Sequence, residues 1–164
     1  MKVKNSNPKF KVVVHHLPKR QFEKEFKEYG KKTQALAEEV NKKAAVSKIY
    51  IKKGQSPKQF KKVMQHEIGH AISDKDELHK KFSKSEKKVI REFAKEMYGK
   101  HRGKTSPQED LREGLAWVYA KGKTGSPKEK KIIRKEYKNV YDKFKEAKKR
   151  LNMKVVKKTY GVVK

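Results

Sequence analysis

The sequence contains no cysteine, which excludes disulfide bridges and thiolate metal ligands. A metal site in this chain must therefore use histidine, aspartate or glutamate. No apolar run approaches the roughly 20 residues that span a bilayer. Lysines near Met1 are not followed by the apolar core of a secretory signal. We therefore expect a protein that is cytoplasmic, or that is delivered without a recognisable signal peptide.

Acidic residues are scarce relative to basic ones. The 164 residues include 47 Lys and Arg but only 19 Asp and Glu, a formal net charge of +28. The net charge is +10 over 1–56 (15 basic, 5 acidic), +5 over 57–110 (14 and 9) and +13 over 111–164 (18 and 5). Only six basic residues are Arg, whose planar fork reads base edges. The composition indicates either a solvated lysine-rich exterior or non-specific contact with a polyanion or nucleic acid.

Apolar residues make up only 34% of the chain, and the mean hydropathy is −1.13. A chain of this length is typical of one domain, which we place at 1–164. Within it we distinguish an N-terminal strand and helix (1–46), a central part that holds the motifs (47–121), and a C-terminal basic helix and tail (122–164).

Hydrophobic periodicity predicts mostly helices. Alternation predicts strands over 10–14 and 47–52, and apolar residues spaced three and four apart predict a helix over 19–45. The final helix runs to about 151, and 154–164 is interpreted as a strand or a mobile basic end. Four further helices are expected to begin after N-cap serines, three of which precede proline: Ser56, Ser83, Ser106 and Ser126.

One short stretch carries recognisable chemistry, His66-Glu67-Ile68-Gly69-His70, within the helix that follows Ser56. Residues four apart in a helix share one face about 6 Å apart, so both imidazoles can bind one tetrahedral zinc. Glu67 points to the neighbouring edge, from which it can reach a metal-bound water as a general base. Gly69 lowers helix propensity, which indicates a close approach by another group.

A catalytic zinc usually takes a third protein ligand, for which the sequence offers four candidates. Glu109 and Glu113 lie four apart on one face of a later helix, while Asp76 and His79 follow the motif helix. Asp76 would require a sharp turn, and Ser73 stands where metzincins carry the turn glycine. Glu109 is also the third residue after an N-cap, where glutamate commonly completes a capping box.

The pentad and the later segment Ser106-Pro-Gln-Glu109-Asp-Leu-Arg-Glu113-Gly-Leu-Ala together resemble the gluzincin metallopeptidases. The resemblance is greatest to compact gluzincins and to the anthrax lethal-factor-like catalytic domains of toxins. It implies a helix-rich α+β zincin domain with a small sheet, whose edge, including 47–52, lines the substrate cleft.

The resemblance also implies the ligands and their supports. Zn²⁺ would be bound by His66, His70 and Glu109, while Glu113 would orient a ligand histidine. Its departures from the family pattern are Arg112 and Gly114, which replace small alanines.

The same resemblance implies the catalytic groups of a zinc metalloendopeptidase acting on a peptide or protein. Glu67 would be the general base and Tyr98 the oxyanion donor, with His101 as an alternative donor. Trp117 is expected to pack in the core, away from the edge of the two glutamates. Two other functions stay open: a catalytically idle, zinc-stabilised binding module, and a basic nucleic-acid-associated protein with a fortuitous pentad.

Overall fold

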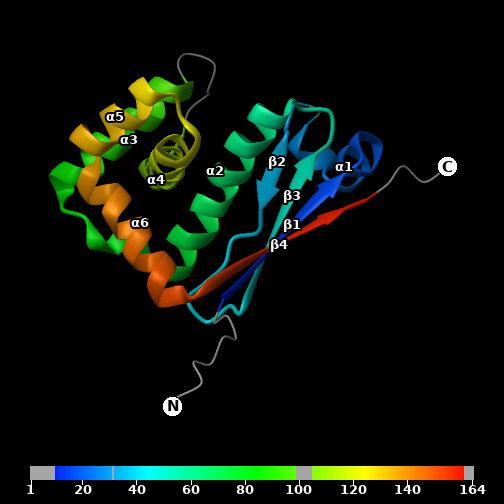
Figure 1. The fold of residues 1–164 in the computed structure, drawn as a ribbon, viewed down its shortest axis with the longest axis horizontal. Coiled ribbons are helices and arrows are strands. Elements are labelled where there is room, and N and C mark those ends of the chain that lie inside the picture. Colours follow the sequence, from blue (N-terminus) through cyan, green and yellow to red (C-terminus); the bar gives the residue numbers. More distant parts are fainter. Residues whose placement is uncertain (1–9, 31, 99–104, 161–164) are drawn as a thin grey trace.

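The computed structural model describes residues 10–30, 32–98 and 105–160, which form a small mixed sheet and six α-helices (Figure 1). The predicted α+β class is confirmed. The strands are β1 (Phe10–Leu17), β2 (Ala35–Ala37), β3 (Val46–Lys52) and β4 (Met153–Thr159). The helices are α1 (Lys19–Glu25), α2 (Pro57–Asp76), α3 (Lys84–Tyr98), α4 (Pro107–Thr124), α5 (Pro127–Glu136) and α6 (Lys138–Leu151), with short 3-10 helices η1 (Lys27–Tyr29) and η2 (Leu78–Lys81).

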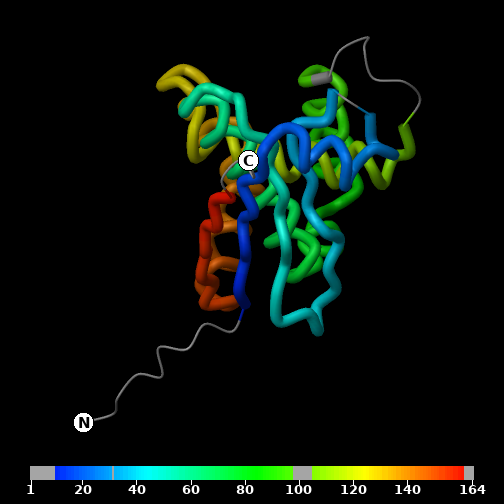
Figure 2. Tube along the Cα trace, turned by 90° about the vertical axis from the view of Figure 1, so that its right-hand side faces the viewer, coloured from blue at the N-terminus to red at the C-terminus, as the bar shows by residue number. Residues whose placement is uncertain are grey.

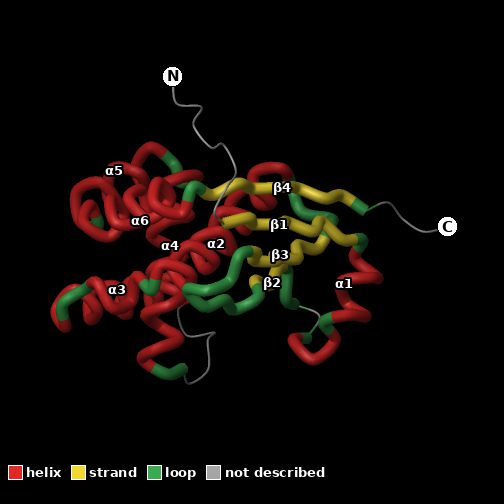
Figure 3. Tube along the Cα trace, turned by 90° about the horizontal axis from the view of Figure 1, so that it is seen from below, coloured by secondary structure: helices red, strands yellow, loops and turns green. Residues whose placement is uncertain are grey.

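The sheet has the strand order β2-β3-β1-β4, in which β1 runs parallel to both of its neighbours and β2 is the antiparallel edge strand. Helices α2 to α6 lie on one side of the sheet and α1 lies at the other (Figures 1 and 3). Phe10, Val12 and Val14 of β1 are buried in the core beneath α2. The sheet therefore has one face in the core, while among the described residues its other face is covered by α1 at one end (Figure 2).

The helix predicted over 19–45 is wrong. Helix α1 ends at Glu25, and the chain reverses at Gly30, which adopts a φ of +85° that side-chain-bearing residues rarely adopt. Residues Ala35–Ala37 then pair with β3, so Ala35 lies opposite Ile51. Apolar residues whose spacing suggested one helix belong in succession to the helix α1, the 3-10 helix η1 and the edge strand β2. As a result, β2 rather than β3 forms the sheet edge.

The motif helix α2 begins as its sequence predicts. The Ser56 side chain accepts a hydrogen bond from the backbone N–H of Gln59, and Pro57 occupies the first helical position. Its central turns, from Met64 to Ser73, are largely buried because the sheet lies on one side and α4 on the other. The helix ends at Glu77 in the left-handed conformation.

Two glycines allow α4 to pack closely against its neighbours. A Cβ built on Gly114 would lie 2.3 Å from the carbonyl oxygen of Ile90 in α3. A Cβ on Gly69 would lie 3.1 Å from the Cα of Ala116. The close approach that Gly69 indicated is therefore the backbone of α4. Gly114, a departure from the gluzincin pattern, holds α3 against the opposite side of the same helix.

The C-terminal part differs from the prediction in one respect. The expected helix from 127 to 151 is divided at Tyr137, whose φ of −123° and ψ of 23° are not helical. After α6 the chain reverses at Asn152, which has a φ of +46°, and returns as β4, so the strand interpretation of the tail holds for 153–159. Within the described residues, no helix combines the length and apolarity needed to cross a membrane.

Replacing Gly114 with alanine tests the close packing of α3 on α4. Alanine favours helix by about 1 kcal/mol over glycine, but overpacking a core costs about 1–3 kcal/mol, more where rigid backbone is the obstacle. We expect Gly114→Ala to lower the free energy of unfolding by at least about 1 kcal/mol. Urea denaturation measures this loss, and Gln108→Ala, at an exposed position of the same helix, is the control. Unchanged stability in Gly114→Ala would contradict the packing.

Candidate metal centre

His66 and His70 lie one turn apart on the face of α2 that meets α4. Both are buried, with only 6% and 3% of their surfaces exposed. The ring centroids are 4.6 Å apart and the rings are nearly perpendicular, at 82°. The helical spacing of the pentad therefore brings the two imidazoles together, as the sequence predicts.

The carboxylate that meets these histidines belongs to Glu113 of α4. His66 Nε2 lies 3.0 Å from Glu113 Oε2, and His70 Nε2 lies 3.0 Å from Glu113 Oε1. One ligand atom from each of the three residues falls within 4.8 Å of the others. Zinc bonds of about 2.0–2.1 Å in a tetrahedron separate ligand atoms by about 3.3 Å, so the cluster fits this ion in donor type and spacing.

The geometry therefore favours Glu113 as the third ligand, in place of Glu109, for which Glu113 was expected to be the support. Glu109 lies in the first turn of α4, where it is exposed and its backbone N–H donates to the Ser106 hydroxyl. The contact between α2 and α4 is at Ala116, about 10 Å further along the helix axis at 1.5 Å per residue. Only Glu113 is close enough to that crossing to reach the histidines.

The other two candidates lie away from the cluster. Asp76, at the end of α2, accepts hydrogen bonds from Lys81 and from Arg150 of α6. It thereby joins the end of the motif helix to the last helix. His79 lies in η2 and is exposed. In the part of the chain that the structure describes, His66, His70 and Glu113 form the one group able to hold a metal.

Burial and hydrogen bonding prepare the three side chains for metal binding. Burial lowers the pKa of His70 to about 4, although contact with Glu113 opposes this, so the imidazole is neutral at pH 7. Burial alone would raise the pKa of Glu113, but hydrogen bonds from both histidines outweigh it and hold that pKa well below its usual range. The Nδ1 atoms of both histidines have no hydrogen-bond partner among the described residues. The polar contacts of both rings are therefore made by their Nε2 atoms with the Glu113 carboxylate.

Glu67 lies beside this cluster without joining it. Burial raises its pKa to about 7, and the nearby Glu113 adds to the effect, while His66 and Arg112 oppose it. Glu67, His70 and Glu113 line a cavity of ≈ 380 Å³ together with residues of η1, β2 and β3. The cavity continues past the sheet edge to aromatic and aliphatic side chains: Phe26, Tyr29, Leu36 and Tyr50. The Glu67 carboxylate and two of the three candidate ligands, His70 and Glu113, thus share one space that is large enough for a side chain.

Two neighbours of the cluster were not anticipated. Trp117 packs on the core as expected, but its ring centroid also lies 4.1 Å from that of His66. Trp117 lies four residues after Glu113 and so shares its face of α4, and this spacing could have predicted that Trp117 lies beside the histidines. Arg112 Nε and Nη2 donate to the two carboxylate oxygens of Asp74 at 3.2 and 3.0 Å. This pair joins α4 to α2 immediately beside Glu113.

The predicted oxyanion donors cannot be placed relative to the cluster. The side chain of Tyr98, at the end of α3, and the whole of His101 lie outside the described residues. Two other tyrosines, Tyr29 and Tyr50, line the cavity and carry hydroxyl donors. The role of Tyr98 therefore stays a prediction.

Comparison of the chain with protein-family models, curated proteins and solved structures finds no match.

The ligand set predicts which variants lose metal. We expect purified wild type to bind one zinc per chain, and Glu113→Gln to weaken zinc affinity at least about a hundredfold because one anionic donor is lost. Glu109→Gln has the same chemistry one turn earlier in α4 and should retain wild-type zinc content. Competition with a chromogenic chelator measures both affinities. Loss of zinc in Glu109→Gln with retention in Glu113→Gln would reverse the assignment.

The Arg112–Asp74 pair predicts a coupling between α2 and α4. It is bidentate and largely buried on the Asp74 side, with 11% of that side chain exposed. A double-mutant cycle of alanine variants, followed by urea denaturation, should give a coupling energy of about 1–2 kcal/mol. The exposed Lys80–Glu77 pair is the control, for which we expect less than about 0.5 kcal/mol. Equal coupling in the two cycles would contradict a joining role.

Proposed function

We propose that this protein is a zinc-dependent metalloendopeptidase, as the gluzincin resemblance implies. One observation carries the proposal. The Nε2 atoms of His66 and His70 converge on the carboxylate of Glu113. Glu113 and His70 line one cavity together with the buried carboxylate of Glu67. Two imidazoles and one carboxylate leave a fourth tetrahedral position open, which is the donor set of catalytic rather than structural zinc sites.

Zinc held by His66, His70 and Glu113 would polarise the scissile carbonyl and lower the pKa of a bound water. Glu67 follows His66 directly and projects from the neighbouring edge of α2, so it reaches the same space without sharing the ligand position. In this arrangement Glu67 accepts a proton from the attacking water and later delivers one to the leaving nitrogen. Placing that carboxylate in a buried pocket restricts competing contacts with bulk water.

The substrate would bind along the cavity beside β2. This strand is the sheet edge, and its residues line the cavity from Ala35 to Ala37. An extended peptide added to such an edge gains main-chain hydrogen bonds and directs alternate side chains into adjoining pockets. The pocket beyond the edge is lined by Phe26, Tyr29 and Leu36, which suits an apolar or aromatic substrate side chain. The strand at the edge of the cleft is therefore β2, which lies next to the expected strand 47–52 in the sheet.

The general-base role predicts that Glu67→Gln abolishes turnover while leaving zinc in place. Glutamine keeps the size and much of the hydrogen bonding of glutamate but cannot accept the proton of the water. We expect peptide cleavage to fall about a hundred- to ten-thousand-fold. Cleavage of an unbiased peptide library, mapped by mass spectrometry, measures the rate. Zinc content and circular dichroism should match those of wild type.

The control for this variant is Gln59→Glu, which changes charge on the exposed first turn of α2 and should cleave normally. Equal cleavage by wild type and Glu67→Gln would contradict the role of Glu67. A wild type that binds zinc stoichiometrically but cleaves nothing would instead favour the idle, zinc-stabilised binding module. A wild type without zinc would favour the basic nucleic-acid-associated protein.

A further inference from the structure

The sheet face opposite α2 is a surface that the proposed peptidase uses only toward β2, where Leu36 and Tyr50 line the cavity. Figure 2 looks onto this face, where β4, β1 and β3 run side by side and α1 lies across one end. Alternation places the core residues of β1 on the α2 side and their neighbours Lys11, Val13 and His15 on this outer side. In the described part of the chain, no other helix lies over these strands in Figures 1 and 2.

The charged side chains that the strands β1, β3 and β4 contribute to this outer face are all of one sign. Lys11 is the register partner of Lys154, Val13 lies beside Lys48, and His15 lies beside Lys158. All four lysines are exposed. None of β1, β3 or β4 contains an acidic residue. The four ammonium groups therefore form a positive surface without carboxylates from their own strands.

A row of rings crosses the same face at one level. His15 stacks on Tyr50 of β3, with centroids 5.0 Å apart and planes 14° apart. On its other side His15 stacks on Tyr160, at 5.8 Å, and its Nδ1 lies 2.7 Å from the Tyr160 hydroxyl. All three rings are partly exposed. Exposed aromatic groups among lysines on an open sheet are the two components with which proteins hold single-stranded nucleic acid.

We propose that this outer face, defined by Lys11, Lys48, Lys154, Lys158 and the ring row, binds single-stranded nucleic acid without sequence preference. The lysines neutralise phosphates, while bases stack at the partly exposed end of the ring row at Tyr160. Away from α1, the described part of this face consists of strands and carries no protruding helix or hairpin that could enter a duplex groove, so a single strand is the better fit.

Two observations refine this choice. The apolar residues exposed between the lysines are small, such as Val46, which is 42% exposed, so the face lacks the large apolar side chains that enter a membrane. Glu25 and Glu38 act on His15 from the α1 and β2 side, whereas Lys48 and Lys158 act on it from the strands. A bound strand would therefore run along β1 and β4, with Lys48 of β3 beside it, and Tyr50 is the one residue of the ring row that also lines the peptidase cavity.

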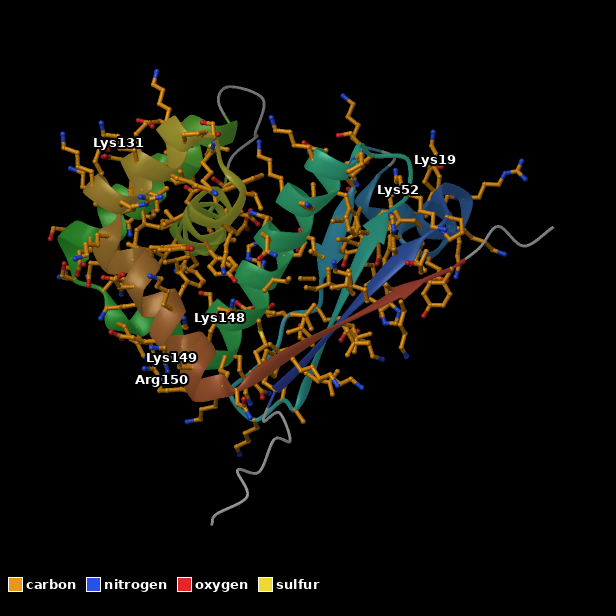
Figure 4. The ribbon with its side chains drawn as sticks, viewed as in Figure 1. Lys19, Lys52, Lys131, Lys148, Lys149 and Arg150 are labelled. Carbon is orange, nitrogen blue, oxygen red and sulfur yellow. The ribbon has the colours of Figure 1, made fainter. Side chains whose placement is uncertain are left out.

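The test compares two variants that remove the same charge. The first carries glutamine at Lys11, Lys48, Lys154 and Lys158. The control carries glutamine at four exposed lysines of α5 and α6, of which Lys131 is labelled in Figure 4 on the far side of the molecule from α1: Lys128, Lys131, Lys135 and Lys138. Fluorescence anisotropy with labelled oligothymidine of about 20 nucleotides gives the affinities.

Four phosphate contacts to a single strand predict a slope of about −2.8 in log affinity against log salt, or about fiftyfold between 50 and 200 mM. The sheet-face variant should bind at least about tenfold more weakly at the lower salt, with a flatter slope. The control should stay within about threefold of wild type, and added chelator should change neither result. Equal losses in the two variants would overturn the proposal, because net charge alone would then explain binding.

Tyr160 separates nucleic acid from other polyanions. Tyr160→Ala removes a stacking ring, which should weaken oligothymidine binding about five- to a hundredfold, while Tyr160→Phe should retain it. Heparin has no bases, so its affinity should be the same in all three proteins. Unchanged oligothymidine binding in Tyr160→Ala, or an equal loss of heparin binding, would overturn the choice of nucleic acid in favour of another acidic polymer.

Discussion

The arrangement of the candidate site depends on the close contact between α2 and α4 at Gly69. Because this residue has no Cβ, the backbone of Ala116 approaches to a distance at which any side chain would be tight. The contact fixes α4 along its own axis relative to α2. One turn before Ala116 lies Glu113, which is thereby brought level with the two histidines on either side of Gly69. On the opposite side of α4, Gly114 packs closely against the backbone of Ile90, so α4 lies between two helices.

This dependence explains why the sequence predicted two ligands and not the third. His66 and His70 belong to one helix, and their spacing alone places them together. Glu109 and Glu113 also share one face, so periodicity cannot distinguish them. Which of the two glutamates meets the histidines depends on where α2 and α4 cross, and this is a property of tertiary packing. Gly69 indicated a close approach, but nothing local indicated which neighbour approached.

The helix predicted in the N-terminal part was wrong for a different reason. Apolar residues at spacings of three and four between 19 and 45 satisfy a helical pattern, yet tertiary pairing prevails where Ala35–Ala37 can complete the sheet beside β3. The residue that signalled the break was Gly30, whose positive φ ends the helical run. N-cap serines such as Ser56 were reliable because capping is local, requiring only a side chain and the backbone three residues later. The missed edge strand then becomes one wall of the cavity beside Glu67.

The two proposed surfaces use opposite electrostatics on opposite sides of one sheet. On the helical side, Glu67, Glu113 and Asp74 lie close together, and Arg112 is the cation paired with Asp74 beside them. On the outer side, the strands present lysines and no carboxylates of their own. Charges separated by more than the Debye length of about 8 Å at physiological salt are largely screened where solvent intervenes. Tyr50 belongs to both the ring row and the cavity, so a nucleic acid would leave the cleft open by running along β1 and β4, at the Tyr160 end of the row.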